Sequence, residues 1–131
     1  MRQHYNGVIK SITDNVQDNT DDPFIQITPD SGKDLYLLAC KISWLLYQVN
    51  SWSTISLKLD STILETMQIS ITSSSNLNST HGAYEFLSKG NKIANGELLT
   101  LQHNGNGIST GLISGINGTM LLLEVDEGES P

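Results

Sequence analysis

Positive charge is scarce in this sequence, and its scarcity argues against two classes of partner. Seven lysines and arginines face fourteen aspartates and glutamates, for a net charge of −7, and Arg2 is the only arginine. Nucleic-acid binding depends on lysine and arginine side chains that displace counterions from phosphates, and anionic membranes are bound by similar clusters. Because the lysines here form no basic run, we expect neither a nucleic-acid nor a membrane partner.

Cysteine and long apolar runs are also scarce. Cys40 is the only cysteine, so the chain forms no internal disulfide and gives no indication of an oxidising compartment. The first ten residues, MRQHYNGVIK, lack the apolar centre of a secretory signal. The longest weakly charged stretch, Leu35–Val49, is too short to span a bilayer. These features predict a cytoplasmic location.

Motifs for catalysis, cofactors and metals are missing from the sequence. The three histidines lie far apart, and no nucleophile, phosphate-loop or dinucleotide pattern occurs. The acidic segment Asp14–Asp22 resembles the start of a calcium loop, but proline stands where an EF-hand needs glycine and again where it needs glutamate. We therefore predict no enzymatic activity, no cofactor and no metal. A catalytic pair could still assemble in space from His103, Asp60, Glu65 and Glu97.

Alternating apolar and polar residues are the main structural signal of the first half, about residues 5–72. Their period of two predicts strands at residues 8–12, 24–28, 54–60 and 67–71, with a further apolar strand at 35–39. From Leu38 to Val49 the apolar residues recur at helical spacing instead, which favours a short helix over Ser43–Gln48. We expect this half to be barrel-like.

Asn-Gly pairs punctuate the second half, about residues 84–126. They occur at 95–96, 104–105, 106–107 and 117–118, and Asn-Gly favours the type I′ turn of a β-hairpin. The short apolar segments between them predict a β-meander, with the continuously apolar Met120–Leu123 as a central strand. The acidic tail, 126–131, is expected to fray.

Together the two halves predict one mostly-β domain over residues 1–131. Two architectures fit the pattern: a small antiparallel barrel or a two-layer sheet, either with one or two short helices.

Three aromatic residues, Trp44, Tyr47 and Trp52, lie within nine positions of one another. If Ser43–Gln48 is helical, Trp44 and Tyr47 fall off its apolar stripe and are partly exposed. Exposed aromatic side chains offer large contact areas at low entropic cost, which is typical of protein interfaces. The alternative is that they close one end of the fold. The preferred function is a non-catalytic interaction module, such as a subunit or adaptor, which binds a protein partner or itself through this patch or an edge strand.

The order of segments in residues 5–63 also resembles a known family. Gly7-Val-Ile-x-x-Ile precedes the strands FIQIT and LYLLA, and Lys41-Ile-Ser43 and TISLKLDST follow. This is similar to the small OB-like barrel of TOBE and molybdopterin-binding (Mop) domains, with their Ile-Thr-x-x-Ser and Ile-Lys-Ala-Ser/Thr motifs. The resemblance implies an alternative function, the binding of a small oxyanion such as molybdate. The positions that match or adjoin the motifs are Lys41, Ser43, Lys58, Ser61 and Thr62.

Overall fold

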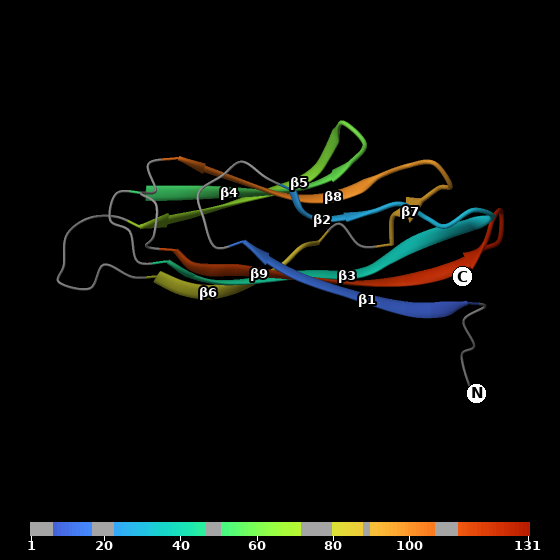
Figure 1. Cartoon of the computed structure of the whole chain (residues 1–131), viewed down its shortest axis with the longest axis horizontal. Coiled ribbons are helices and arrows are strands. Elements are labelled where there is room, and N and C mark those ends of the chain that lie inside the picture. The colour runs from blue at the N-terminus through green and yellow to red at the C-terminus, as the bar shows by residue number, and fades with distance from the viewer. Residues whose placement is uncertain (1–6, 17–22, 47–50, 72–79, 88–89, 107–112) are drawn as a thin grey trace.

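The computed structural model describes residues 7–16, 23–46, 51–71, 80–87, 90–106 and 113–131, whose regular elements are all strands (Figure 1). In chain order these are β1 (Val8–Val16), β2 (Pro23–Ile27), β3 (Lys33–Leu46), β4 (Ser51–Leu59), β5 (Thr62–Ile71), β6 (Thr80–Glu85), β7 (Lys92–Ile93), β8 (Leu99–Asn106) and β9 (Ile113–Asp126). The mostly-β prediction is confirmed. No helix of the described ranges has the length and apolar character that a membrane crossing requires.

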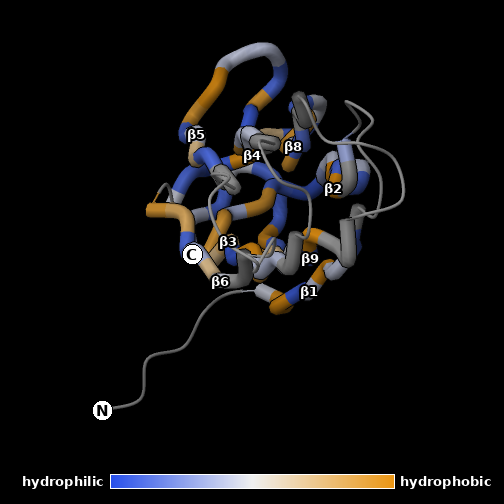
Figure 2. The backbone as a smooth tube through the Cα atoms, turned by 90° about the vertical axis from the view of Figure 1, so that its left-hand side faces the viewer, coloured by the Kyte–Doolittle hydropathy of each residue, from blue (hydrophilic) through white to orange (hydrophobic). Residues whose placement is uncertain are grey.

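The strands form two antiparallel sheets that lie one above the other (Figure 1). In the five-stranded sheet β1 pairs with β9, β9 with β3, and β3 with both β6 and β7. The four-stranded sheet runs in the order β2-β8-β4-β5. Seen along the strands, β2, β8, β4 and β5 make one layer and β1, β9, β3 and β6 the other (Figure 2). Of the two predicted architectures, the structure therefore has the two-layer sheet and not the closed barrel.

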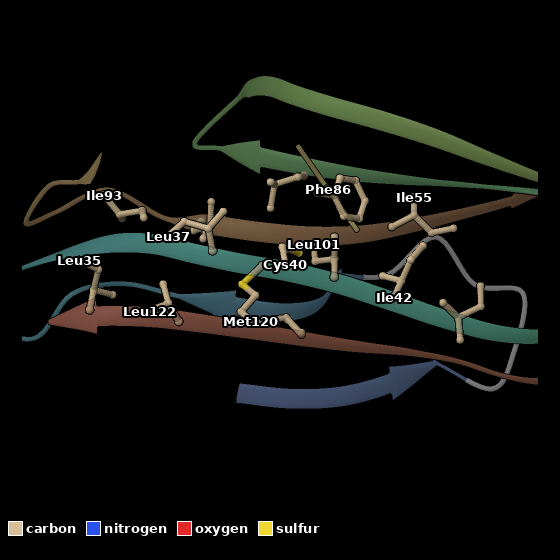
Figure 3. Packing of buried hydrophobic residues seen from close by; sticks show 14 residues of the cluster. Leu35, Leu37, Cys40, Ile42, Ile55, Phe86, Ile93, Leu101, Met120 and Leu122 are labelled. Carbon is tan, nitrogen blue, oxygen red and sulfur yellow. The ribbon is translucent and has the colours of Figure 1, made fainter. Parts of the chain in front are cut away.

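The hydrophobic core fills the space between the layers (Figure 3). Both sheets supply side chains at alternate positions, because successive residues of a strand point to opposite faces. The buried cluster consists of Ile25, Leu35, Leu37, Cys40, Ile42, Ile55, Leu57, Phe86, Ile93, Leu99, Leu101, Ile116, Met120 and Leu122. Met120–Leu123 is central, as expected, since β9 lies between β1 and β3.

The predicted helix over Ser43–Gln48 is wrong for the residues described, which continue β3 past a bulge. The register with β9 shifts between Leu37 and Ala39, which inserts one extra residue. Odd-numbered residues up to Leu37 therefore face the core, but from Cys40 onward even-numbered residues do so. Leu38, Ile42 and Leu45, which recur at helical spacing in the sequence, all lie in this one strand, and residues 43–46 continue it. Residues 47–48 lie outside the described ranges.

The predicted meander is also wrong, because the strands of the second half pair with the first half. β8 lies between β2 and β4, and β9 lies between β1 and β3. Asn95-Gly96 does form a turn, in which Gly96 has a φ of 92°. Asn104-Gly105 and Asn117-Gly118, however, lie within β8 and β9, and Asn106 ends β8. Pairing with β4 at Asn104-Gly105, and with both β1 and β3 at Asn117-Gly118, overrides the local turn preference of Asn-Gly.

Candidate functional site

The carboxylates that could have joined a catalytic pair accept hydrogen bonds from backbone amides. Asp60, in the turn between β4 and β5, accepts one from the Leu98 amide at 2.9 Å. Glu97 accepts one from the Ala94 amide at 2.7 Å. His103 is fully buried on β8. Within the described ranges, no group of three or more histidine, cysteine, aspartate or glutamate side chains could hold a metal ion.

Glu65 ties the edges of the two sheets together. From β5 it accepts a hydrogen bond from the Tyr84 hydroxyl of β6 at 2.5 Å and another from the Leu87 amide at 2.8 Å. Hydrogen bonding to Glu65 raises the pKa of Tyr84. The Tyr84 ring packs edge-on against Phe86, with 5.2 Å between the ring centroids. Glu65 therefore serves to join the layers.

Asp34 anchors two chain segments at one end of the molecule. Its buried carboxylate accepts hydrogen bonds from the amides of Asn95 and Gly128, each at 2.9 Å, and lies 3.4 Å from Lys92 Nζ. These donors lower the pKa of Asp34, the bond from Gly128 most of all. The Tyr36 hydroxyl also donates to the Glu129 carbonyl at 3.3 Å. The acidic tail is thus hydrogen-bonded to β3, contrary to the expected fraying.

A polar hollow of about 570 Å³ lies near the C-terminal end of β9, and some of the residues that line it form ion pairs. It is lined by Gly7, Val8, Lys33, Glu124, Val125, Asp126 and Glu129. Lys33 pairs with Asp126 at 2.6 Å, and Lys10 pairs with the mostly buried Glu124 at 2.6 Å. Lysines therefore pair with two of the three acidic residues that line the hollow.

The structure gives only a partial view of the predicted aromatic patch. Trp44 is half-buried, packs against the core, and lies over Gly82 of β6. Its buried Nε1 has no hydrogen-bond acceptor among the described residues. Trp52 belongs to β4, but its side chain, like the whole of Tyr47, lies outside what the structure describes.

The residues implied by the Mop resemblance do not come together. Lys41 and Ser43 lie on β3, exposed on the face of the five-stranded sheet that points away from the core. Lys58 is at the end of β4, and Ser61 and Thr62 are exposed at the turn into β5, all in the other sheet. The structure forms no single anion site from these two groups.

Large apolar side chains are exposed at Leu87, after β6, at Ile63 on β5, and at two consecutive residues of β1. Val8 and Ile9 are 61% and 56% exposed, respectively. All nine residues of β1 pair with β9 without a register shift, from Val8 opposite Glu124 to Val16 opposite Ile116. On its other side β1 has no strand partner among the described residues. We call that side the free edge of β1.

The other sheet edges are interrupted. β2 is five residues long, begins with a proline, and shifts register between Pro23 and Ile25. β5 carries a shift in its pairing with β4, and β6 and β7 are separate short strands along β3. Prolines, bulges, short strands and edge charges protect edges against foreign strands, and of these β1 has only the charges, Lys10 and Asp14. The sequence predicted a strand at residues 8–12, but the fact that it is an edge emerges only from the pairing order.

No protein-family model and no curated protein sequence matches this chain.

Proposed function

We propose that the chain is a non-catalytic protein-interaction module that binds its partner along the free edge of β1. The observation that carries the proposal is a nine-residue edge strand without proline or bulge, which bears the exposed side chains of Val8 and Ile9. An added strand satisfies the open backbone donors and acceptors of such an edge, while neighbouring side chains supply specificity.

One hydrogen bond indicates which backbone groups face the free edge. The Asn15 amide donates to Asp14 Oδ1 at 2.8 Å, so this amide is not engaged by β9. Backbone groups alternate between the two sides of a strand. The odd-numbered residues Ile9, Ser11, Thr13 and Asn15 therefore turn their amides and carbonyls toward the free edge.

Proline at Ser11 tests this proposal. The substitution Ser11→Pro removes an outward amide and places a ring where an incoming strand would bind, and a free edge tolerates proline better than a central strand does. Immobilised wild-type chain should retain a protein from its native source that Ser11→Pro does not retain. Circular dichroism checks that the variant is folded.

Ser31→Pro is the matched control. Ser31 occupies the second position of a turn closed by the Lys33 amide and the Asp30 carbonyl at 2.9 Å, with Gly32 at a φ of 75°. Proline is favoured at that position. The Ser31→Pro variant should bind as the wild type does, and equal capture by Ser11→Pro would refute the proposal.

A further inference from the structure

We infer that the strand which binds the free edge of β1 is β1 of a second copy of this chain, antiparallel to it and centred on Ile12. This inference rests on the proposed function and names the partner. It joins two five-stranded sheets into one continuous sheet across a twofold axis.

The sequence of β1, VIKSITDNV, is complementary to itself in this register. With Ile12 opposite Ile12 of the second copy, Lys10 faces Asp14 and Ser11 faces Thr13. Val8 faces Val16, and Ile9 faces Asn15. Every pair therefore joins apolar to apolar, opposite charges, two hydroxyls, or an exposed apolar residue to an amide. Cross-strand pairs of the first two kinds stabilise antiparallel strands, whereas directly opposed like charges destabilise them.

Other registers lose this match. Moving the axis to Ser11 or to Thr13 sets Ile12 opposite Lys10 or Asp14, respectively. Moving it one residue further sets Lys10 opposite Lys10 or Asp14 opposite Asp14. Placing it between two residues would oppose side chains from different faces of the sheet, because the side-chain period is two. The register on Ile12 also pairs odd residues with odd residues, so the outward backbone groups of both copies meet.

The charges around Lys10 and Asp14 suit the pairing. Lys10 Nζ contacts Glu124 at 2.6 Å and Asp30 at 3.4 Å, and an ammonium group has a third donor. Asp14 is exposed and makes no ion pair within the described part of the chain. Lys10 therefore keeps one donor for Asp14 of the second copy, beside the two carboxylates that it already contacts.

Cysteine cross-linking tests both the partner and the register. Opposed residues of a hydrogen-bonded antiparallel pair have Cα atoms about 5.5 Å apart, within the range that a disulfide spans. A mixture of the Ser11→Cys chain and the Thr13→Cys chain should therefore form covalent dimers on mild oxidation. Either variant alone, and a mixture of Ser11→Cys with Asn15→Cys, should form far fewer. Equal cross-linking in all four samples would overturn the register.

The oligomeric state gives the second measurement. Wild-type chain and the Ser31→Pro variant should have twice the 14.3 kDa chain mass by light scattering, and Ser11→Pro should be monomeric. The substitution Asp14→Lys places a lysine opposite Lys10 of the other copy, once on each side of the axis. It should raise the dissociation constant of the dimer roughly tenfold. Glu127→Lys, the same charge change at an exposed residue beyond the end of β9, should leave the dimer unchanged.

A wild-type chain that stays monomeric throughout a dilution series overturns the inference. The proposed function would then still stand if a different protein from the native source is captured by the wild type and lost with Ser11→Pro. If neither self-association nor edge-dependent capture occurs, both proposals fail.

Discussion

Cys40 illustrates how burial dominates the chemistry of a residue. Its side chain is fully buried in β3, and desolvation raises the pKa of the thiol to about 12, with a smaller contribution from the negative charge of Glu65. Because the thiolate is the reactive form, we expect DTNB to label native protein only as fast as the chain opens. In denaturant the same reagent should react at once. Rapid labelling of the native protein at pH 8 would contradict this burial.

The ionisation of a single residue, Asp34, makes the stability of the fold depend on pH. Its folded-state pKa is lowered, so the carboxylate stabilises the fold above its ordinary pKa of 3.8, and the contribution disappears as the pH falls through the folded value. Asp34→Asn should therefore lower stability against urea at neutral pH, because the amide cannot replace the acceptor of both backbone bonds. The difference from wild type should shrink below pH 3.8.

Glu127→Gln serves as the control for Asp34→Asn, since Glu127 is exposed and exposed substitutions have small effects. If the loss of stability in Asp34→Asn stays constant from neutral to acid pH, the loss is not electrostatic.

At the scale of elements, the pairing of β3 with β6 depends on a glycine. Gly82 lies opposite Trp44, and a Cβ at residue 82 would come within 2.7 Å of the indole ring. Gly82→Ala should therefore displace the ring and destabilise the protein by about 1–3 kcal/mol, as overpacking does. Urea unfolding followed by far-ultraviolet circular dichroism measures the effect.

Ala83→Val provides the comparison for Gly82→Ala. Ala83 is the next residue of the same strand and is exposed on the opposite face, so the change should be within about 0.5 kcal/mol. If the two variants lose the same amount of stability, the effect comes from strand propensity and not from the contact with Trp44.

At the scale of the whole molecule, the two halves of the sequence are interleaved. Among the described strands, the first half contains one internal pairing, β4 with β5, while β1, β2 and β3 pair with strands of the second half. A fragment of residues 1–72 should therefore be unfolded by circular dichroism. The full chain should unfold in one transition, with fluorescence and circular dichroism coinciding. A folded fragment, or two separate transitions, would show that the halves are independent.

The sequence by itself determined the strand positions and the character of the surface. Alternating residues predicted strands within β1, β2, β4 and β5, because a strand exposes two faces to two environments regardless of its neighbours, and an apolar stretch predicted the start of β3. The composition likewise predicted an acidic chain without basic patches. For the candidate site, this reasoning supplied the strand at residues 8–12 and the expectation that an edge strand could bind a partner.

Tertiary structure decided which strands meet, and with that the features that local patterns misread. The bulge at Leu38 changes which residues of β3 face the core, and residues 43–46 are a strand because β6 and β9 pair with them. Asn117-Gly118 is extended because it pairs with β1 on one side and with β3 on the other. This pairing outweighs the local preference of Asn-Gly for a turn. The free edge of β1 follows from the same pairing order, since an edge is defined by the absence of a neighbour, and neighbours in this fold are distant in sequence.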